Sequence, residues 1–346
     1  MAGYTNSAFR RLIKFFAPQT ITFSEFASAD GLKFGSQRTL ELLKFHRAEK
    51  PFVVQIFGKK PENFVEAAKI IEQLGAAGVD LNFGCPARKV VNSDHGSALL
   101  KNPELAEKII RATGKAVRIP VSVKMRLGIA DASNLIKFAK MVEAAGAKLL
   151  TIHGRTAQQK YSGIADYEPI YAVAKVLKIP VIGNGDITSV QDFQKRLQNL
   201  AGLMIGRAAL ARPWLLREIA NFLQGKRSLA PRSLKAKVPT ILRHARLMVA
   251  TKGEELGMRE LRKFLVGYAR NYPQAKSLRA KLVRVSSFAE LQKILQEVDA
   301  PNSRSLATCT QKASEQSVRA VPTKQIKFRI ISSQYPKPRS DQSPVF

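Results

Sequence analysis

Cysteine is scarce in this sequence, whose 346 residues contain only two, Cys85 and Cys309. Two cysteines so far apart cannot form a disulfide framework, which makes the reducing cytoplasm the expected compartment. No run approaches the roughly 20 apolar residues that a membrane-spanning helix requires. These absences exclude a disulfide-stapled secreted module and an integral membrane protein, and they predict a globular cytoplasmic protein.

Acidic residues are also few, because 26 Asp and Glu stand against 57 Lys and Arg, a formal net charge of +31. Residues 226–346 alone contain 25 basic and 8 acidic residues. Such an excess is larger than the few charges that keep a domain soluble. It predicts a polyanionic partner, with nucleic acid as the first candidate and an anionic membrane surface as the second.

Short apolar runs alternate with amphipathic helical patterns from residue 20 to about residue 225. The predicted strands are residues 20–25, 52–57, 79–83, 121–125, 149–153, 181–183 and 203–205. Strands that alternate with helices form a parallel sheet, either doubly wound or closed as a (β/α)8 barrel. Residues 1–6 read as a strand-to-helix loop without its strand, and no strand is followed by a G-x-G-x-x-G turn or a P-loop. We therefore predict an α/β fold, a (β/α)8 TIM barrel that lacks its first strand.

The pattern changes after residue 225, which predicts three regions. Residues 1–225 form the barrel. Residues 226–299 are expected to form a small all-helical domain, with helices at 234–249, 259–269 and 288–298 that carry basic side chains. Residues 300–346 are rich in Ser, Thr, Gln and Pro, and are expected to be a disordered basic tail with one short strand at 326–331.

Cys85 directly follows a predicted buried strand, at a place where barrel enzymes present catalytic side chains. A thiol there can transfer a proton or attack a carbon atom, or it can be a small buried apolar group. Polar residues leave the ends of all seven strands, which favours the functional reading. They are Ser24, Glu25, Gln55, Asn82, Cys85, Lys124, Arg126, His153, Arg155, Asn184, Gly185, Asp186, Gly206 and Arg207.

The last two strand ends carry Asn184-Gly185-Asp186 and Gly206-Arg207. Loops at these barrel positions often bind a phosphate through backbone N–H groups and a cation, although the glycines could also serve only the turns. With Gln55, Lys124 and His153 nearby, the pattern suggests flavin mononucleotide (FMN). Lys124 would place positive charge near N1 and C2=O of the flavin, and Gln55 could hydrogen-bond its pyrimidine edge.

These motifs together resemble the tRNA-dihydrouridine synthases, in particular the bacterial B type. The resemblance runs from Met1 to about residue 295. It is carried by Met1-Ala2-Gly3, Ser24-Glu25, Gln55-Ile56-Phe57-Gly58, Asn82-Phe83-Gly84-Cys85-Pro86, Gly96-Ser97-Ala98-Leu99-Leu100, Lys124-Met125-Arg126, His153-Gly154-Arg155-Thr156, Asn184-Gly185-Asp186 and Gly206-Arg207.

The resemblance implies an oxidoreductase that reduces the C5–C6 bond of a uridine in tRNA, with FMN as cofactor and NADPH as reductant. Cys85 would be the catalytic acid, and Asn82 and Arg126 would place the uracil. FMN would be bound by Met1, Ala2, Gly3, Gln55, Lys124, His153, Asn184, Gly185, Asp186, Gly206 and Arg207. In the basic helical region we select Arg259, Arg262, Lys263, Arg270 and Arg279 for contacts with tRNA phosphates. We expect a monomer, no metal and no membrane partner.

Two other functions stay open at this point. Another FMN barrel oxidoreductase, acting on a free pyrimidine or enone, would share the cofactor rim and would not need the basic helical region. A noncatalytic RNA-binding protein would follow if the missing first strand impaired the barrel, because its absence exposes strand edges.

Overall fold

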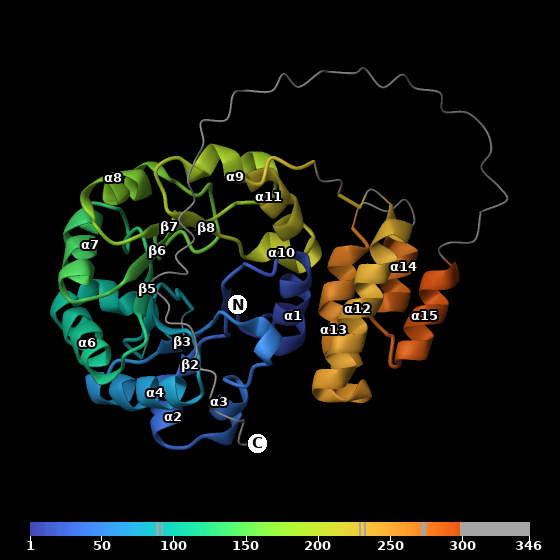
Figure 1. The fold of residues 1–346 in the computed structure, drawn as a ribbon, viewed down its shortest axis with the longest axis horizontal. Helices are drawn as coiled ribbons and strands as arrows, with labels where there is room; N and C mark the ends of the chain where they lie inside the picture. The colour runs from blue at the N-terminus through green and yellow to red at the C-terminus, as the bar shows by residue number, and fades with distance from the viewer. Residues whose placement is uncertain (88–89, 91–92, 228–229, 232, 271–274, 298–346) are drawn as a thin grey trace.

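A curled sheet of parallel strands forms the centre of the structure (Figure 1). The computed structural model describes residues 1–297 apart from 88–89, 91–92, 228–229, 232 and 271–274. The strands are β1 (Thr22–Phe23), β2 (Ala27–Ser28), β3 (Phe52–Phe57), β4 (Gly78–Phe83), β5 (Val121–Arg126), β6 (Leu149–His153), β7 (Val181–Asn184) and β8 (Gly202–Met204). Their order is β1-β3-β4-β5-β6-β7-β8, with β2 also paired to β3. The seven predicted strands and the barrel-type α/β fold are confirmed.

The first strand of the sheet is split in two. Thr22 pairs with Phe52 and Ser28 with Phe57, so β1 and β2 lie along the same edge of β3 and are separated by residues 24–26. Within the described residues, no ladder of hydrogen bonds joins β8 to β1. The parallel sheet therefore curls as in a TIM barrel while its two outer strands stay unpaired with each other.

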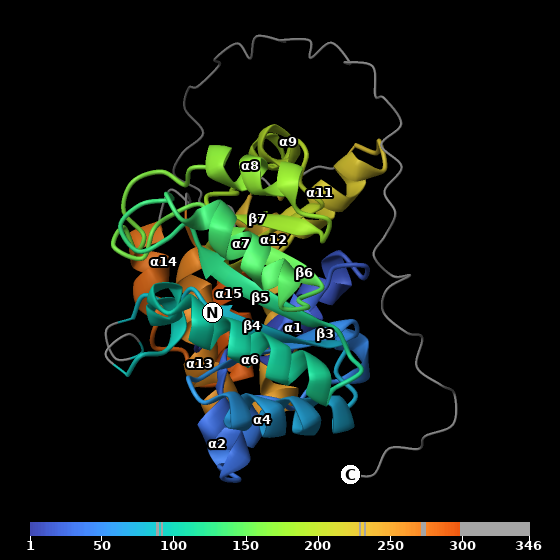
Figure 2. The ribbon, with the colours of Figure 1, turned by 90° about the vertical axis from the view of Figure 1, so that its left-hand side faces the viewer.

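Helices cover the outer surface of the curled sheet (Figures 1 and 2). They are α1 (Ser7–Phe16), α2 (Ala29–Lys33), α3 (Gln37–Glu41), α4 (Pro61–Gln73), α6 (Pro103–Ala116), α7 (Leu135–Ala144), α8 (Glu168–Val176), α9 (Val190–Leu197), α10 (Arg207–Ala211) and α11 (Leu215–Leu223), with short 3-10 helices at Arg47–Glu49 and Gly96–Lys101. Local signals start several of them. Proline occupies the first turn of α4 and α6, and the Asn102 side chain accepts a hydrogen bond from the Leu105 N–H at 3.0 Å.

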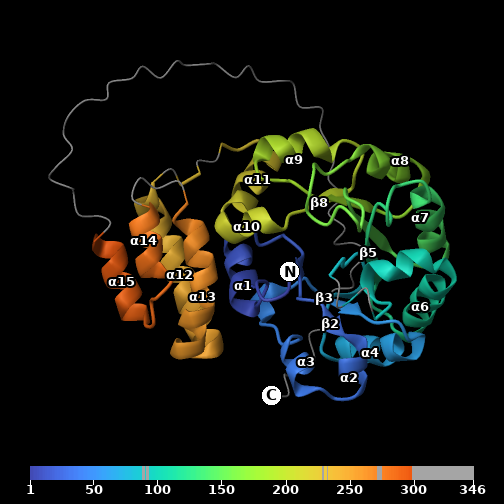
Figure 3. The ribbon, with the colours of Figure 1, turned by 180° about the vertical axis from the view of Figure 1, so that it is seen from behind.

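Four further helices form a second body beside the sheet (Figure 3). They are α12 (Leu234–Lys252), α13 (Glu254–Tyr268), α14 (Ala275–Leu282) and α15 (Phe288–Glu297). The three predicted helices are confirmed, although α13 begins five residues earlier than the predicted start at 259, and α14 was not predicted. No described helix is long and apolar enough to cross a membrane. The predicted tail and its strand at 326–331 lie outside the described residues, as does Cys309.

The apolar core of these four helices also includes α1. Phe9 of α1 stacks on Phe264 of α13 with ring centroids 5.4 Å apart, and Leu12 is fully buried in the same cluster. Trp214, which precedes α11, packs there as well. The hydrophobic core therefore crosses the predicted division at residue 226, and α1 is the element that joins the two bodies.

A buried ion pair fixes α1 against the edge of the sheet. The Nε of Arg10 lies 2.5 Å from Oε2 of Glu49, and neither side chain is more than 4% exposed. Arg10 also donates to the carbonyl oxygens of Thr5 and Lys44 at 2.6 and 3.1 Å, and its guanidinium lies 4.5 Å from the centroid of the Phe52 ring. Because both charges are paired and hydrogen-bonded, their mutual attraction and these hydrogen bonds offset the desolvation penalty of burying them.

We predict that Glu49→Gln destabilises the protein by about 3 kcal/mol or more, because it leaves the buried guanidinium of Arg10 without a counter-charge. Urea unfolding measures the change. Glu66→Gln is the control, since the Lys69–Glu66 pair at 2.9 Å is about half exposed, and its loss should cost less than about 1 kcal/mol. Equal losses in the two variants would contradict this account.

Candidate active site

The register of the central strands places polar side chains on one face of the sheet. Neighbouring residues in a parallel register point to the same side, and alternate residues of each strand share that side. Three rows cross the strands in this way: Gln55, Asp80 and Ser122; Asn82, Lys124 and Thr151; and Arg126, His153 and Asn184. Residues that are scattered between positions 55 and 184 of the sequence are thereby brought together.

The Cys85 loop is held in place through its backbone. The N–H groups of Gly84 and Cys85 donate to Oδ1 of Asn82 at 3.1 and 3.0 Å. The carbonyl oxygen of Cys85 accepts from the N–H and hydroxyl of Ser97 at 3.1 and 3.0 Å. Arg126 donates from Nε to the Gly84 carbonyl at 2.9 Å. The backbone is therefore fixed on both sides of a partly exposed thiol.

Gly96 is required for this arrangement. Its φ is +61°, and a Cβ at this position would lie 2.9 Å from the carbonyl oxygen of Cys85. A side chain would therefore push the Cys85 loop away from Ser97, and only glycine adopts this backbone conformation easily.

Lys124 is a half-buried cation for which no described residue is a hydrogen-bond partner. Burial lowers the pKa of its ammonium group to about 8, Asp80 opposes this shift, and Arg126 adds to it. No described residue accepts a hydrogen bond from its Nζ, and the neighbouring Thr151 has a buried Oγ1 that also lacks a partner. Buried polar groups are normally satisfied, so the unpartnered Thr151 hydroxyl beside this cation marks a place where a bound group could complete the hydrogen bonding.

His153 is a neutral imidazole at physiological pH. Burial, together with the neighbouring cations Lys124, Arg126 and Arg155, lowers its pKa to about 3. A neutral ring has one donor and one acceptor nitrogen, so His153 can form a hydrogen bond without adding charge.

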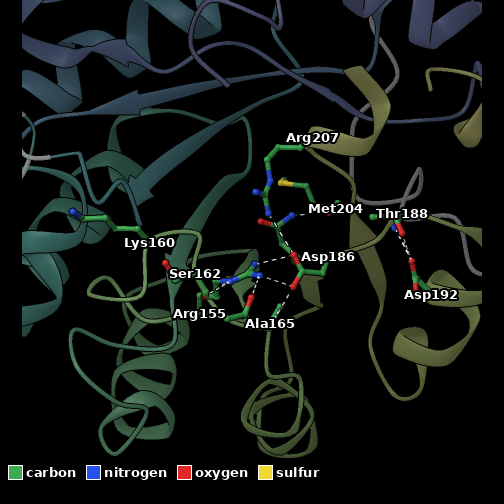
Figure 4. A network of polar contacts seen from close by, with 12 residues as sticks. Arg155, Lys160, Ser162, Ala165, Asp186, Thr188, Asp192, Met204 and Arg207 are labelled. Atoms are coloured by element: carbon green, nitrogen blue, oxygen red, sulfur yellow. Dashed lines mark hydrogen bonds and ion pairs between the residues drawn. The ribbon is translucent and has the colours of Figure 1, made fainter. Parts of the chain in front are cut away.

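An ion pair closes the part of the site beside β7 (Figure 4). Arg155 donates to both carboxylate oxygens of Asp186 at 2.9 and 2.6 Å, and the Ala165 N–H donates to Oδ2 at 2.8 Å. Arg207 reaches Oδ1 at 3.4 Å from another direction. Burial alone would raise the pKa of the Asp186 carboxyl, but the hydrogen bonds from Arg155 and Ala165 and the charges of Arg155 and Arg196 lower it overall. The Asp186 carboxylate is thus committed to holding the loop after β6.

The predicted phosphate loops meet the N-terminal loop. Asn184 donates from Nδ2 to the Met204 carbonyl at 2.7 Å, which ties β7 to β8. A Cβ on Gly206 would lie 3.7 Å from Sδ of Met1. The Arg207 side chain is 56% exposed at the start of α10, so its guanidinium is accessible to an anion. Gly3 is held from the sheet side, where its N–H donates to Oε2 of Glu25 at 2.7 Å.

Three residues of this site, Tyr161, Asp80 and Ser97, were given no role in the sequence prediction, although Ser97 lies within one of the quoted motifs. Tyr161 is 61% exposed, and the guanidinium carbons of Arg207 and Arg126 lie 4.9 and 5.8 Å from its ring centroid. Ser97 holds the Cys85 carbonyl oxygen, and Asp80 accepts hydrogen bonds from Gln55 Nε2 and Ser122 Oγ. Asp80 sits inside the buried strand β4, Ser97 in the 3-10 helix Gly96–Lys101 and Tyr161 in the loop after β6. Their spacing along the chain therefore does not place them at the end of a strand.

The five basic residues selected for RNA contacts have different surroundings. Arg259 is 62% exposed on α13 and lies 4.0 Å from Glu255, Arg270 is exposed, and Arg279 is half-buried on α14. Arg262 instead donates to the Val285 and Arg284 carbonyls at 2.8 and 3.2 Å. Lys263 donates to the carbonyl oxygen of Gly3. The last two side chains therefore already have intramolecular partners, and Lys263 links α13 to the N-terminal loop.

The described residues contain no group of three or more His, Cys, Asp or Glu side chains placed to hold a metal ion.

A family model and similar sequences among known proteins point to the same family. A family model described as dihydrouridine synthase matches residues 1–305. A probable tRNA-dihydrouridine synthase of Rickettsia bellii is 39% identical over 284 residues, 81% of this chain and 86% of that protein. The tRNA-dihydrouridine synthase B of Xanthomonas axonopodis pv. citri is 37% identical over 290 residues, 83% of this chain and 87% of that protein. Among solved structures, histamine dehydrogenase from Rhizobium sp. 4-9 aligns with a TM-score of 0.45 and 13% identity, over 71% of this chain and 44% of that one.

The unpaired Lys124 leads to a prediction about stability and pH. Its pKa of about 8 in the folded protein lies below the reference value of about 10.4 for an unfolded chain. Between these values the unfolded chain binds the proton and the folded protein does not, so this group makes stability rise with pH. Relative to Lys124→Met, the parent should gain roughly 2 kcal/mol between pH 7 and 9.5.

Urea unfolding at the two pH values measures this difference. Lys14, whose pKa burial also lowers to about 8, is present in both proteins and cancels. Lys108→Met, which removes an exposed lysine of α6, should show no such pH dependence. A constant difference between the parent and Lys124→Met would refute the assignment.

Proposed function

The chain belongs to the dihydrouridine synthase family, and on this premise we propose that it reduces the C5–C6 double bond of a uridine in tRNA. FMN is the proposed cofactor, NADPH the proposed reductant of FMN, and a monomer the proposed working form. Residues 1–225 are proposed as the FMN-binding catalytic domain and residues 226–299 as the tRNA-binding domain. The observation that carries this proposal is the Cys85 loop, in which a fixed backbone presents a free thiol beside Asn82 and Lys124.

The residues of the site fit a flavin. Lys124 offers an unpaired cation, Thr151 an unsatisfied hydroxyl, and His153 a neutral ring, all on the inner face of neighbouring strands. Gln55 is fixed nearby and could meet the pyrimidine edge, while Met1, Ala2 and Gly3 with Asn184, Gly185, Asp186, Gly206 and Arg207 would surround the remainder of the cofactor. When bound, FMN supplies the hydride that adds to C6 of the uracil.

Cys85 completes the reduction by donating a proton. Hydride addition at C6 leaves an electron pair at C5, and the thiol proton forms the new C5–H bond, so that one hydride and one proton saturate the double bond. Asn82 and Arg126 would orient the uracil, although both also hold the Cys85 loop. The thiolate that remains recovers its proton from solvent, since the Cys85 side chain is partly exposed.

The target uridine has to leave the RNA stack to reach this thiol. Tyr161 offers an exposed ring beside two arginines, which suits stacking with a nucleotide base. Arg259 and Arg270 are accessible cations on the helical body. An oxidoreductase acting on a free pyrimidine or enone would have no use for these groups, so turnover on tRNA compared with free uridine separates the two functions.

We predict that Cys85→Ala retains the yellow flavin and loses dihydrouridine formation by about 100-fold or more, because general acid catalysis contributes that much. Flavin absorbance of the purified protein and mass spectrometry of the tRNA nucleosides measure the two properties. Cys309→Ala is the matched control and should retain full activity. Normal turnover of Cys85→Ala would refute the proposed acid.

Removing accessible cations from the helical body should weaken tRNA binding and its dependence on salt. We expect Arg259→Gln with Arg270→Gln to reduce the slope of log affinity against log salt concentration by up to about 2, roughly one for each phosphate that the protein no longer neutralises. Lys108→Gln with Lys175→Gln removes the same charge from α6 and α8 of the barrel and should leave the slope nearly unchanged. An equal effect of the two pairs would show that only net charge matters.

A further inference from the structure

A continuous chain of hydrogen bonds runs from Ser122 to the backbone of Cys85. Ser122 Oγ donates to Oδ1 of Asp80 at 2.5 Å, and Gln55 Nε2 donates to Oδ2 of Asp80 at 2.6 Å. Asn82 Nδ2 donates to Oε1 of Gln55 at 2.8 Å. The Cys85 N–H donates to Oδ1 of Asn82 at 3.0 Å. The chain crosses β5, β4 and β3, which lie side by side in Figure 2.

The Cys85 end of this chain requires one direction of its hydrogen bonds. A backbone N–H can only donate, so Asn82 has to present its oxygen to Cys85 and its NH₂ group to Gln55. Gln55 then has to present its own oxygen to Asn82 and its NH₂ group to residue 80. Position 80 is therefore required to accept a hydrogen bond, and a carboxylate, which has only acceptors, meets that requirement.

Burial makes the direction matter energetically. Asp80 is fully buried, and Gln55 and Asn82 are each 8% exposed. An amide turned the wrong way would place two acceptors or two donors against each other where water cannot intervene, which costs far more than at the surface. The amide groups of Gln55 and Asn82 can therefore turn only together.

We propose that Asp80 is a positioning residue that fixes the orientation of the Gln55 and Asn82 amides and, through them, the place of the Cys85 backbone. Asp80 touches neither Cys85 nor the outer rim of the site, and it acts through the two amides. The consequence for catalysis rests on the proposed function, because the same amides would face the flavin and the uracil. The direction of the chain itself rests only on the contacts described.

Moving the carboxylate by two residues tests this proposal. In Asn82→Asp, the new carboxylate can accept from Cys85 but has no donor for Gln55. Gln55 can turn, but its oxygen then faces Asp80, so acceptor meets acceptor in either orientation as long as both carboxyls are ionised. Burial raises the pKa of Asp80, so the conflict should grow with pH. Asp80→Asn should relieve the conflict, because the new amide donates to the turned Gln55 and accepts from the Ser122 hydroxyl. Asp80→Asn alone preserves the original direction, with its NH₂ group donated to Ser122.

We expect Asn82→Asp to lower the thermal midpoint of the full-length protein on the order of 5 °C, the size of one missing hydrogen bond to a charged group. Asp80→Asn/Asn82→Asp should recover most of that loss. In a Cys309→Ser background, the reaction rate of Cys85 with a disulfide reagent should rise several-fold in Asn82→Asp and return towards the parent rate in the double variant.

Charge alone could also produce a rescue, because the double variant has the same number of carboxylates as the parent. Asp80→Ala/Asn82→Asp has that charge too, but an alanine side chain at position 80 supplies no donor to Gln55. A double-mutant cycle compares each double variant with its two single variants and the parent. The coupling energy between positions 80 and 82 should be clearly smaller in the cycle with Asp80→Ala than in the cycle with Asp80→Asn. Equal coupling in the two cycles, or purely additive effects, would overturn the proposal.

A second pair covers the case in which Asn82→Asp does not fold. Gln55→Glu creates the same acceptor conflict with Asp80. Asp80→Asn should relieve it and supply a donor, whereas Asp80→Ala removes the opposing acceptor but leaves the new carboxylate at position 55 without a donor, so it should rescue less. Soluble yield is then the readout, and no difference between the Asn and Ala rescues would again refute the proposal. None of these measurements uses turnover of tRNA. A protein inactive on tRNA would overturn the proposed function and leave this result standing.

Discussion

The parallel register of β3, β4, β5 and β6 is the constraint on which the site depends. It places Gln55 beside Asp80, Asn82 beside Lys124, and Arg126 beside His153 on one face of the sheet. A shift of one residue in any of these strands would turn its polar side chains into the apolar layer between sheet and helices. The register therefore has to be maintained by strong apolar packing, which the fully buried Val79, Leu81, Val123 and Ile152 provide from the other face of the same strands.

Polar groups that have partners within the protein serve its structure, whereas polar groups without such partners mark the candidate active site. Arg10 with Glu49, and Arg155 with Asp186, are buried or half-buried pairs whose hydrogen bonds are used within the protein. Lys124, by contrast, is a half-buried ammonium for which no described residue is a partner, next to a fully buried Thr151 hydroxyl that also has none. Because a partly buried charge without a partner is costly, its presence beside the Cys85 loop indicates a place for a bound group rather than a structural contact.

The basic helical body is coupled to the site through the N-terminal segment. The α1 helix contributes Phe9 and Leu12 to the core of α12 and α13, while Arg10 of the same helix is paired with Glu49 at the edge of the sheet. Just before α1, Gly3 accepts a hydrogen bond from Lys263 of α13 and donates one to Glu25. The proposed RNA-binding surface and the proposed cofactor loop thus both contact the N-terminal segment, residues 1–16.

The strands and the barrel type could be predicted from the sequence, because they follow from local patterns such as apolar runs and helix-start signals. The polar residues at strand ends pointed to a functional role for Cys85, and its assignment as the catalytic acid stays a prediction. The same patterns could not reveal that Arg262 and Lys263 have intramolecular partners, that Tyr161 lies beside two arginines, or that Asp80 contacts Gln55. Those facts depend on which residues meet across strands and between distant helices. They had to come from the folded structure, since hydrogen-bond direction and charge pairing are set by contacts within a few ångströms, not by spacing along the chain.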